Sequence, residues 1–364
     1  MEYFCPRCGA KEDIRSPKPK CGCGGLWSLD FSPPSWDASL IDRDQWNIFR
    51  YRAFLPPLGE GWKRLTLGEG MSPIVELEPG LLLKMDYFMP SLSFKDRGAA
   101  VLAWLCDAIG VASVVQDSSG NAGNSVAAYC ARAGIACEIF VPEGTSPKKI
   151  AMIESHNAKV VVVPGSRDAC ARSCREKVDR ESLYYANHVY NPFFYEGTKT
   201  YIYETFEQLG RLPDNLFIPV GNGTLFLGVA KALGELAGSG AIKALPHIVA
   251  VQSEACAPLA KAAAAGSAKP AKVNPRPTLA EGIAIGEPMR GEEILKIAES
   301  LGAEFILAPE DLILPARKAL AAKGIYCEHT TAATYAAYLA NRSKGRWKGD
   351  IMLPMCGAGL KSDK

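Results

Sequence analysis

Residues 111–141 have the sequence VASVVQDSSGNAGNSVAAYCARAGIACEIFV, and this stretch carries the pattern that decides the fold. It begins with the short apolar run 111–115, passes through a loop of small polar residues, continues as the alanine-rich segment 122–133 and ends in a second apolar run, 137–141. Two apolar runs on either side of a helix-like segment are typical of a βαβ unit, whose two strands are parallel. The stretch therefore predicts an open α/β sheet.

The same alternation of strand-like and helix-like segments extends in both directions. We expect strands at 74–77, 81–85, 159–163, 216–220 and 247–251, and helices at 98–110, 147–156, 167–181 and 224–237. This order indicates α/β architecture, with mostly parallel sheets covered by helices on both faces. Residues 260–277 are rich in Ala, Lys, Pro and Gly and show no strand signal, so we expect an exposed, mobile insertion there.

Composition excludes several classes of protein. The 364 residues include 41 Lys+Arg and 39 Asp+Glu without a basic block, which argues against a nucleic-acid partner. Hydrophobic residues make up 48%, enough for a sizeable core and too many for general disorder. No apolar run reaches the roughly 18–20 residues that span a bilayer, and the first residues do not have the pattern of a signal peptide. We therefore expect a cytoplasmic protein that does not bind a membrane.

The chain has 12 cysteines, which a reducing cytoplasm keeps as thiols, metal ligands or catalytic groups rather than disulfides. Cys5, Cys8, Cys21 and Cys23 form two close pairs flanked by glycines, the spacing of a tetrahedral four-thiolate site. We predict a structural zinc ribbon, with a ribbon that no longer holds metal as the alternative. Six other cysteines are expected to be small core residues: Cys106, Cys130, Cys137, Cys170, Cys174 and Cys256. For Cys170 and Cys174, the alternative is a pair that binds a metal ion.

Two loops that follow predicted strands suit a ligand. In open α/β sheets, ligands bind beyond the carboxyl ends of strands, where helix N-termini present free N–H groups. The loop 117–124, DSSGNAGN, offers small residues and neutral hydrogen-bonding groups. The loop 221–224, GNGT, has the glycines of a phosphate cradle, although it lacks the P-loop and dinucleotide patterns. Either loop alone has a plain turn as its alternative.

A third segment, SFKDRG at 93–98, places Lys95 at the start of a predicted helix. The positive end of the helix dipole disfavours a cation there, so a lysine at this position is a candidate functional residue. Such a lysine can serve as an amine nucleophile that forms a Schiff base. The alternative is a surface lysine paired with Asp96.

Taken together and in this order, the three segments resemble the pyridoxal-phosphate enzymes of the tryptophan-synthase β-chain type, and most closely the threonine synthases. The resemblance extends over nearly the whole chain, through the blocks 68–73, 93–98, 191–200, 324–328 and 357–361 and the cysteine ribbon. It implies fold type II: two open, twisted, mostly parallel sheet domains. We expect a zinc-ribbon-like segment at 1–30, a large cofactor-binding domain at 31–96 and 196–364, a small mobile substrate-side domain at 97–195, and a homodimer.

The resemblance also implies residue roles. Lys95 holds pyridoxal phosphate as a Schiff base and moves protons at the substrate carbons, and Asn121 bonds the ring hydroxyl. The cofactor phosphate binds Gly221, Asn222, Gly223 and Thr224, and the substrate carboxylate binds Ser118, Ser119 and Gly120. A phosphate on the substrate needs charge-assisted donors, for which the candidates are Asn191, Lys199, Ser166 and Arg167.

Cys356 stands where the family usually has Ser or Thr beside the ring nitrogen. A thiol is also a neutral, weak donor, and a neutral partner favours elimination and replacement at the β- or γ-carbon. The alternative is a small buried hydrophobic residue. His329 stands in place of a family proline, either as a loop residue or as an acid/base group.

The resemblance implies a lyase that releases phosphate from O-phosphohomoserine and adds water to give threonine. Departures from the family pattern at 89–92, 221–224 and 328–332 leave other substrates open. One alternative is β-replacement on O-phosphoserine or another activated serine, as in cysteine or cysteate synthases, and another is a deaminating eliminase. A non-enzymatic binding module, in which the ribbon docks a partner, is a further alternative, but the presence of Lys95, Asn121 and the GNGT loop counts against it.

Overall fold

A computed structural model describes residues 1–361 of the chain. The described residues divide into two compact units: unit 1 comprises residues 1–70 and 95–198, and unit 2 comprises 71–94 and 199–361. Unit 1 thus includes residues 31–70, which the sequence-based division grouped with the carboxyl-terminal part. One of the boundaries lies directly before Lys95, so the predicted cofactor lysine opens the second segment of unit 1.

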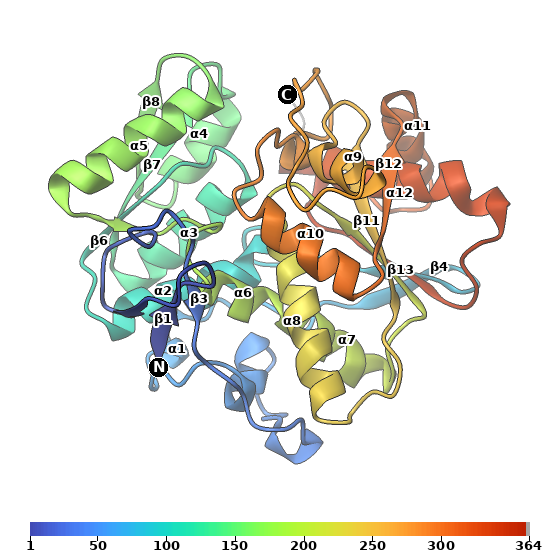
Figure 1. The fold of residues 1–364 in the computed structure, drawn as a ribbon, viewed down its shortest axis with the longest axis horizontal. Helices are drawn as coiled ribbons and strands as arrows, with labels where there is room; N and C mark the ends of the chain where they lie inside the picture. Colours follow the sequence, from blue (N-terminus) through green and yellow to red (C-terminus); the bar gives the residue numbers. More distant parts are fainter. Residues whose placement is uncertain (362–364) are drawn as a thin grey trace. The chain divides into compact units, whose positions relative to one another are not determined.

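Unit 1 contains two sheets (Figure 1). The amino-terminal ribbon is an antiparallel sheet of order β2-β1-β3, formed by β1 (Glu2–Phe4), β2 (Lys11–Asp13) and β3 (Ser28–Leu29). The second sheet is parallel, of order β8-β7-β6-β9, formed by β6 (Ser113–Gln116), β7 (Ala136–Pro142), β8 (Lys159–Val163) and β9 (Tyr184–Tyr185). The α-helices are α1 (Trp62–Leu65), α2 (Lys95–Ala108), α3 (Asn121–Ala133), α4 (Pro147–Glu154), α5 (Arg167–Glu181) and α6 (Phe193–Thr198), and 3₁₀ turns cover Ala38–Leu40 and Ile48–Phe54.

Glycines let α2 and α6 approach each other closely in unit 1. A Cβ added at Gly98 would lie 2.3 Å from the ring of Phe194, and one added at Gly197 would lie 2.0 Å from the carbonyl oxygen of Arg97. Both distances are far below van der Waals contact, so only glycine fits at either position. The two helices thereby hold Phe194 beside the start of α2, next to Lys95.

Unit 2 is built on a six-stranded sheet of order β12-β11-β10-β13-β5-β4, in which only β4 runs antiparallel to its neighbour. The strands are β4 (Ile74–Glu78), β5 (Leu81–Lys84), β10 (Asn215–Pro219), β11 (His247–Ser253), β12 (Glu304–Ala308) and β13 (Ile351–Pro354). The helices are α7 (Thr200–Leu209), α8 (Thr224–Gly238), α9 (Pro258–Ala264), α10 (Gly291–Ser300), α11 (Glu310–Ala321) and α12 (His329–Asn341), with 3₁₀ turns at Asp86–Phe88, Glu281–Ile283, Arg342–Lys344 and Gly359–Lys361. Every residue of β10 and β13 is buried, so helices cover both faces of the sheet, as continuous apolar strands require.

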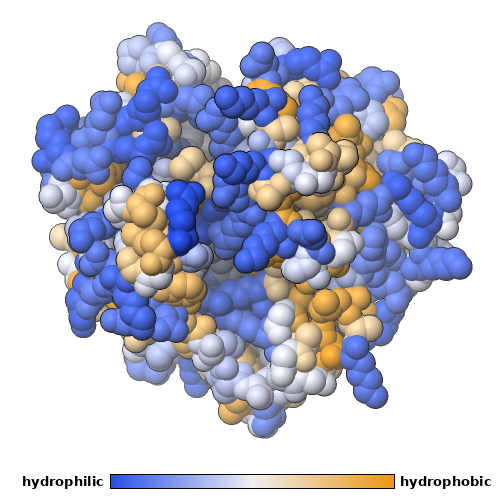
Figure 2. Space-filling view, in the orientation of Figure 1, coloured by the Kyte–Doolittle hydropathy of each residue, from blue (hydrophilic) through white to orange (hydrophobic). Residues whose placement is uncertain are grey.

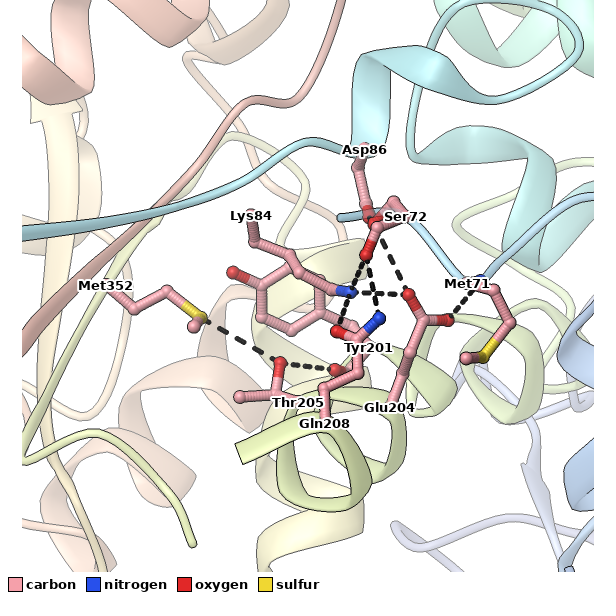
Figure 3. A network of polar contacts seen from close by, with 9 residues as sticks. All are labelled: Met71, Ser72, Lys84, Asp86, Tyr201, Glu204, Thr205, Gln208 and Met352. Carbon is pink, nitrogen blue, oxygen red and sulfur yellow. Dashed lines mark hydrogen bonds and ion pairs between the residues drawn. The ribbon is translucent and has the colours of Figure 1, made fainter. Parts of the chain in front are cut away.

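A polar network lies in the core of unit 2 (Figure 3). The ammonium of Lys84 donates to the Glu204 carboxylate, to the Gln208 side-chain oxygen at 2.8 Å and to the Ser72 carbonyl at 2.5 Å. The Ser72 hydroxyl donates to Asp86 at 2.6 Å, and the Met71 N–H donates to Glu204 at 2.8 Å. The network ties residues 71–72, which belong to the block 68–73, to strand β5 and helix α7.

The α/β class and most element positions predicted from the sequence are confirmed, and α5 has the predicted bounds. The expectation for 260–277 is wrong in its first part, because helix α9 runs to Ala264 and buries Leu259 and Ala262. No helix within residues 1–361 is long and apolar enough to cross a membrane. Figure 2 shows hydrophilic and apolar side chains intermixed on the face that it draws.

Candidate active site

Lys95 is the first residue of the 14-residue helix α2 and is half-buried. Its Nζ lies 5.9 Å from the centre of the Phe194 ring, which belongs to the same unit. The two residues that precede it are held in unit 2: the Phe94 N–H donates to the Cys356 carbonyl at 2.9 Å, and Ser93 forms an isolated antiparallel bridge with Gly357. The backbone on the amino-terminal side of Lys95 is therefore tied directly to the late Cys-Gly turn.

The loop after β6 folds tightly onto the start of α3. A Cβ added at Gly123 would lie 1.8 Å from the carbonyl oxygen of Ser118, so glycine is required for this approach. Asn121 is the first residue of the helix, and no side chain caps its N-terminus. Ser118, Ser119 and Gly120 are partly exposed beside that N-terminus, where helix N–H groups favour an anion.

The half-buried carboxylate of Asp117 anchors this loop to the one after β9. The Tyr185 hydroxyl donates to Asp117, and the Asn187 amide donates to the same oxygen at 2.7 Å. Burial raises the pKa of Asp117, and these two hydrogen bonds work in the opposite direction. Strands β6 and β9 are parallel neighbours, so the two loops leave the sheet at one edge and Asp117 holds them together.

In unit 2 the loop 221–224 lies between β10 and α8. Gly223 has φ +76°, a conformation that favours glycine, and the 15-residue helix α8 begins without a side-chain cap. A Cβ added at Gly221 would lie 2.9 Å from the Gly282 carbonyl oxygen. An uncapped helix N-terminus entered through glycines is the cradle that a phosphate group needs.

Cys356 follows β13, the parallel neighbour of β10, so both loops leave the sheet of unit 2 at the same edge. The side chain of Cys356 is 1% exposed, and the hydroxyl of Thr331 accepts hydrogen bonds from the Cys356 N–H at 3.1 Å and the Gly357 N–H at 3.4 Å. A Cβ added at Gly357 would lie 2.4 Å from the Glu328 carboxyl group. Thr331 was overlooked by sequence reasoning, although it lies within the block 328–332 that departs from the family pattern.

These features fit a phosphorylated ring cofactor. Within unit 1, the amine of Lys95 and the amide of Asn121 each stand at the start of a helix. Within unit 2, the uncapped start of α8 and the thiol of Cys356 follow the neighbouring strands β10 and β13. The Ser93 hydroxyl, two residues before Lys95, is fully buried and has no hydrogen-bond partner among the described residues. A buried hydroxyl of this kind is rare unless a ligand or water completes it.

Two of the predicted phosphate donors are used inside the protein. The Asn191 amide donates to the Tyr184 hydroxyl at 2.9 Å, and its carbonyl oxygen accepts from the Phe193 N–H at 3.0 Å. Lys199 is fully buried and pairs with Glu235 at 3.0 Å. Because these contacts occupy both side chains, we do not carry Asn191 and Lys199 into the proposed substrate site.

Ser166 and Arg167 remain exposed at the start of helix α5, where the Ser166 hydroxyl accepts from the Ala169 N–H at 3.3 Å. His329 is the first residue of helix α12, so it is a helix residue and not a loop residue. Its Nε2 lies 3.4 Å from a guanidinium nitrogen of Arg317. His188, which the sequence analysis did not single out, lies in the loop after β9.

The four amino-terminal cysteines come together as predicted, with ligand atoms all within 4.8 Å of one another. A Cβ added at Gly25 would lie 2.7 Å from the Cys5 sulfur, which explains the glycine beside the second pair. The six cysteines predicted as core residues are all buried. The ribbon also packs on the rest of unit 1: the Tyr3 ring stacks on Trp27 and meets Phe193 edge to face.

The family of pyridoxal-phosphate dependent enzymes matches residues 65–357. Threonine synthase of Methanocaldococcus jannaschii is 31% identical over 380 aligned positions, covering 99% of this chain and 93% of that protein. Threonine synthase of Mycobacterium leprae is 32% identical over 86% of this chain and 88% of that protein.

Solved structures show the same fold at lower identity. Maize serine racemase superposes with a TM-score of 0.70 at 20% identity, over 83% of this chain and 92% of that chain. A threonine deaminase of Solanum lycopersicum superposes with a TM-score of 0.71 at 22% identity, over 94% and 90%. The family match and the relatives that span nearly the whole chain show that this protein belongs to the pyridoxal-phosphate dependent enzymes, as a threonine synthase-like lyase.

Proposed function

We propose that the protein is a threonine synthase, which releases phosphate from O-phosphohomoserine and adds water to give threonine. The observation that carries the proposal is the agreement between the relatives and the site. The threonine synthases align over nearly the whole chain, and this chain keeps a lysine at a helix start, a Ser-Ser-Gly loop and a glycine phosphate cradle.

The proposed roles follow from position and chemistry. When bound, pyridoxal phosphate draws electrons from the substrate carbons and so makes their C–H bonds acidic. Lys95 attaches the cofactor and then moves protons at those carbons, and Asn121 bonds the ring hydroxyl. The backbone N–H groups of Gly221, Asn222, Gly223 and Thr224 hold the cofactor phosphate, and Cys356 gives the ring nitrogen an uncharged neighbour.

On the substrate side, Ser118, Ser119 and Gly120 receive the carboxylate through neutral donors and the N-terminus of α3. The Asp117 bonds to Tyr185 and Asn187 support this role because they fix where the loop stands. Arg167 and Ser166 remain the proposed donors to the substrate phosphate, since a dianion needs charge-assisted hydrogen bonds.

The deciding measurement is phosphate release and amino-acid product from O-phosphohomoserine and O-phosphoserine, assayed side by side with the cofactor-loaded protein. We expect threonine as the product, and a kcat/KM at least about tenfold higher for the longer substrate, because one methylene in a fitted site is worth about 10–200-fold. Lys95→Ala in the same assay controls for contaminating activity. Phosphate release from O-phosphoserine alone would reject threonine synthesis and favour β-replacement on an activated serine.

We also propose that Cys5, Cys8, Cys21 and Cys23 hold a structural zinc ion. The four sulfurs lie within 4.8 Å of one another, and four thiolates are the ligand set of a structural zinc site, which leaves no open position for catalysis. Protein purified without chelator is expected to contain about one zinc ion per chain by mass spectrometry of the metal content. Zinc binding to such sites contributes folding free energy, so we expect Cys8→Ser to lower both the zinc content and the melting temperature. Cys256→Ser is the matched control for losing one thiol, and equal zinc content in both variants would contradict the assignment.

The reducing cytoplasm that we propose as the compartment suits 12 free cysteines. We propose a homodimer, and its mass can be measured by light scattering on the same preparation.

A further inference from the structure

His188 lies in the loop between β9 and α6 and is only 9% exposed. Its Nδ1 is sealed from solvent and has no hydrogen-bond partner in the part of the chain that the structure describes. A buried nitrogen without a hydrogen-bond partner is unfavourable, so native proteins keep few of them. His188 therefore has hydrogen-bonding capacity that the chain itself does not use.

His188 lies among the loops at the carboxyl-terminal edge of the small sheet. Its loop follows β9, the parallel neighbour of β6, and so leaves the small sheet at the same edge as residues 117–120. The residue before it, Asn187, donates to Asp117 at 2.7 Å and thereby joins the two loops. His188 is thus next to the loop proposed to receive the substrate carboxylate.

The charges that act on His188 are both positive. The imidazole of His188 meets the Phe194 ring of α6 edge to face, with 5.8 Å between the ring centres. The Lys95 ammonium of α2 lies 5.9 Å from the centre of the Phe194 ring. Burial first, and then the charges of Lys95 and of Arg167 at the start of α5, lower the pKa of His188 well below its ordinary value. Without a ligand the imidazole is therefore neutral at physiological pH.

The two cations give the surroundings of the neutral imidazole a positive electrostatic potential, which suits an anion. If the cofactor is attached to Lys95, as proposed above, Arg167 is the remaining cation that acts on His188. A dianion bound beside them reverses the local field and makes a charged imidazole favourable, because N⁺–H to O⁻ hydrogen bonds are the stronger kind. The required proton comes from solvent.

We propose that His188 binds the phosphate group of the substrate together with Arg167 and takes up one proton when that anion binds. The inference rests on the proposed phosphorylated substrate and adds a specificity-determining residue to that site. Since the bound state carries the extra proton, the affinity for the anion is expected to fall as pH rises through the titration of His188 in the complex.

Sulfate is the appropriate probe, because it stays a dianion across the neutral range and neither releases nor takes up protons itself. We would titrate sulfate into the cofactor-loaded protein by calorimetry in two buffers of different ionisation enthalpy, which gives the number of protons taken up. The wild type and the control His247→Gln, a surface residue beside Glu304, are expected to take up about one proton per sulfate. His188→Gln is expected to take up none and to bind sulfate about tenfold more weakly, since it loses a charge-assisted hydrogen bond.

Absence of sulfate binding, binding without proton uptake in the wild type, or unchanged uptake in His188→Gln would each overturn the proposal. Nitrogen-15 histidine spectra of the wild type give the same answer without any variant, because they report directly whether a buried ring becomes charged. The proposed function is scored separately, by phosphate release from O-phosphohomoserine. Proton-linked sulfate binding without phosphate release would reject the function and keep His188 as an anion-binding residue, and the reverse result would reject only the role of His188.

Discussion

Replacement of Lys95 with alanine is expected to remove the visible absorption band of the bound cofactor and to lower kcat by about a thousandfold or more. Lys95 has two proposed roles, covalent attachment of the cofactor and proton transfer at the substrate carbons, and a positioned acid or base alone contributes about 10²–10⁴-fold. The band is measured in the purified protein after addition of pyridoxal phosphate, before and after borohydride treatment.

Two further variants make this result specific. Lys95→Arg keeps the positive charge at the start of α2 but cannot form the covalent bond, so it should lose the band as fully as alanine does. Lys261→Ala removes an exposed lysine of α9 and should keep both the band and the activity. A band that persists in Lys95→Ala would place the cofactor on another lysine and reject the assignment.

Replacement of Lys84 with methionine is expected to destabilise the protein by about 3–5 kcal/mol, because it leaves buried acidic groups without their cation. Lys84 and Glu204 are both fully buried, and Asp86 lies in the same network through Ser72 (Figure 3). The loss is measured as a shift of the urea midpoint, followed by the fluorescence of the tryptophans and by circular dichroism.

The partner of Lys84 offers the matched test. Glu204→Gln added to Lys84→Met removes the uncompensated charge of Glu204, the direct partner of Lys84, so the double variant should be more stable than the single one. Lys323→Met breaks an exposed pair with Glu78 and should leave the midpoint unchanged within error. A single Lys84→Met variant as stable as the wild type would show that the network contributes little to the fold.

Local patterns predicted the regular elements well. Helix α5 has the predicted bounds because Ser166 caps it and its polar and apolar residues recur with helical spacing, and both signals lie within the segment itself. Helix α2 begins at Lys95, three residues before the predicted start, because the apolar pattern alone does not mark where the first turn forms. Helix α9 was missed since its Ala- and Lys-rich sequence resembles a linker, and only the surrounding sheet buries Leu259.

The sequence predicted which residue types form the candidate site, but it did not predict which of their side chains are free to bind a ligand. Lys95 and the glycine cradle occupy the predicted positions at helix starts, because small residues after a strand restrict the backbone locally. Asn191 and Lys199 have side chains that suit an anion, yet the fold directs both into the protein. His188 has no sequence companion, and its neighbours come from α2, α5 and α6.

The sequence by itself determined the α/β class, the family, the pairing of four cysteines into one cluster and the lysine at the start of α2, since each depends on residue type and short-range spacing. Only the tertiary structure decided which polar groups are buried, which are already hydrogen-bonded and which charged groups lie close together in space. Lys84 with Glu204, Thr331 with Cys356, and His188 with Lys95 are each far apart in the chain. The free energy of a charge or a hydrogen bond depends on burial and on distance in space, and spacing along the chain specifies neither.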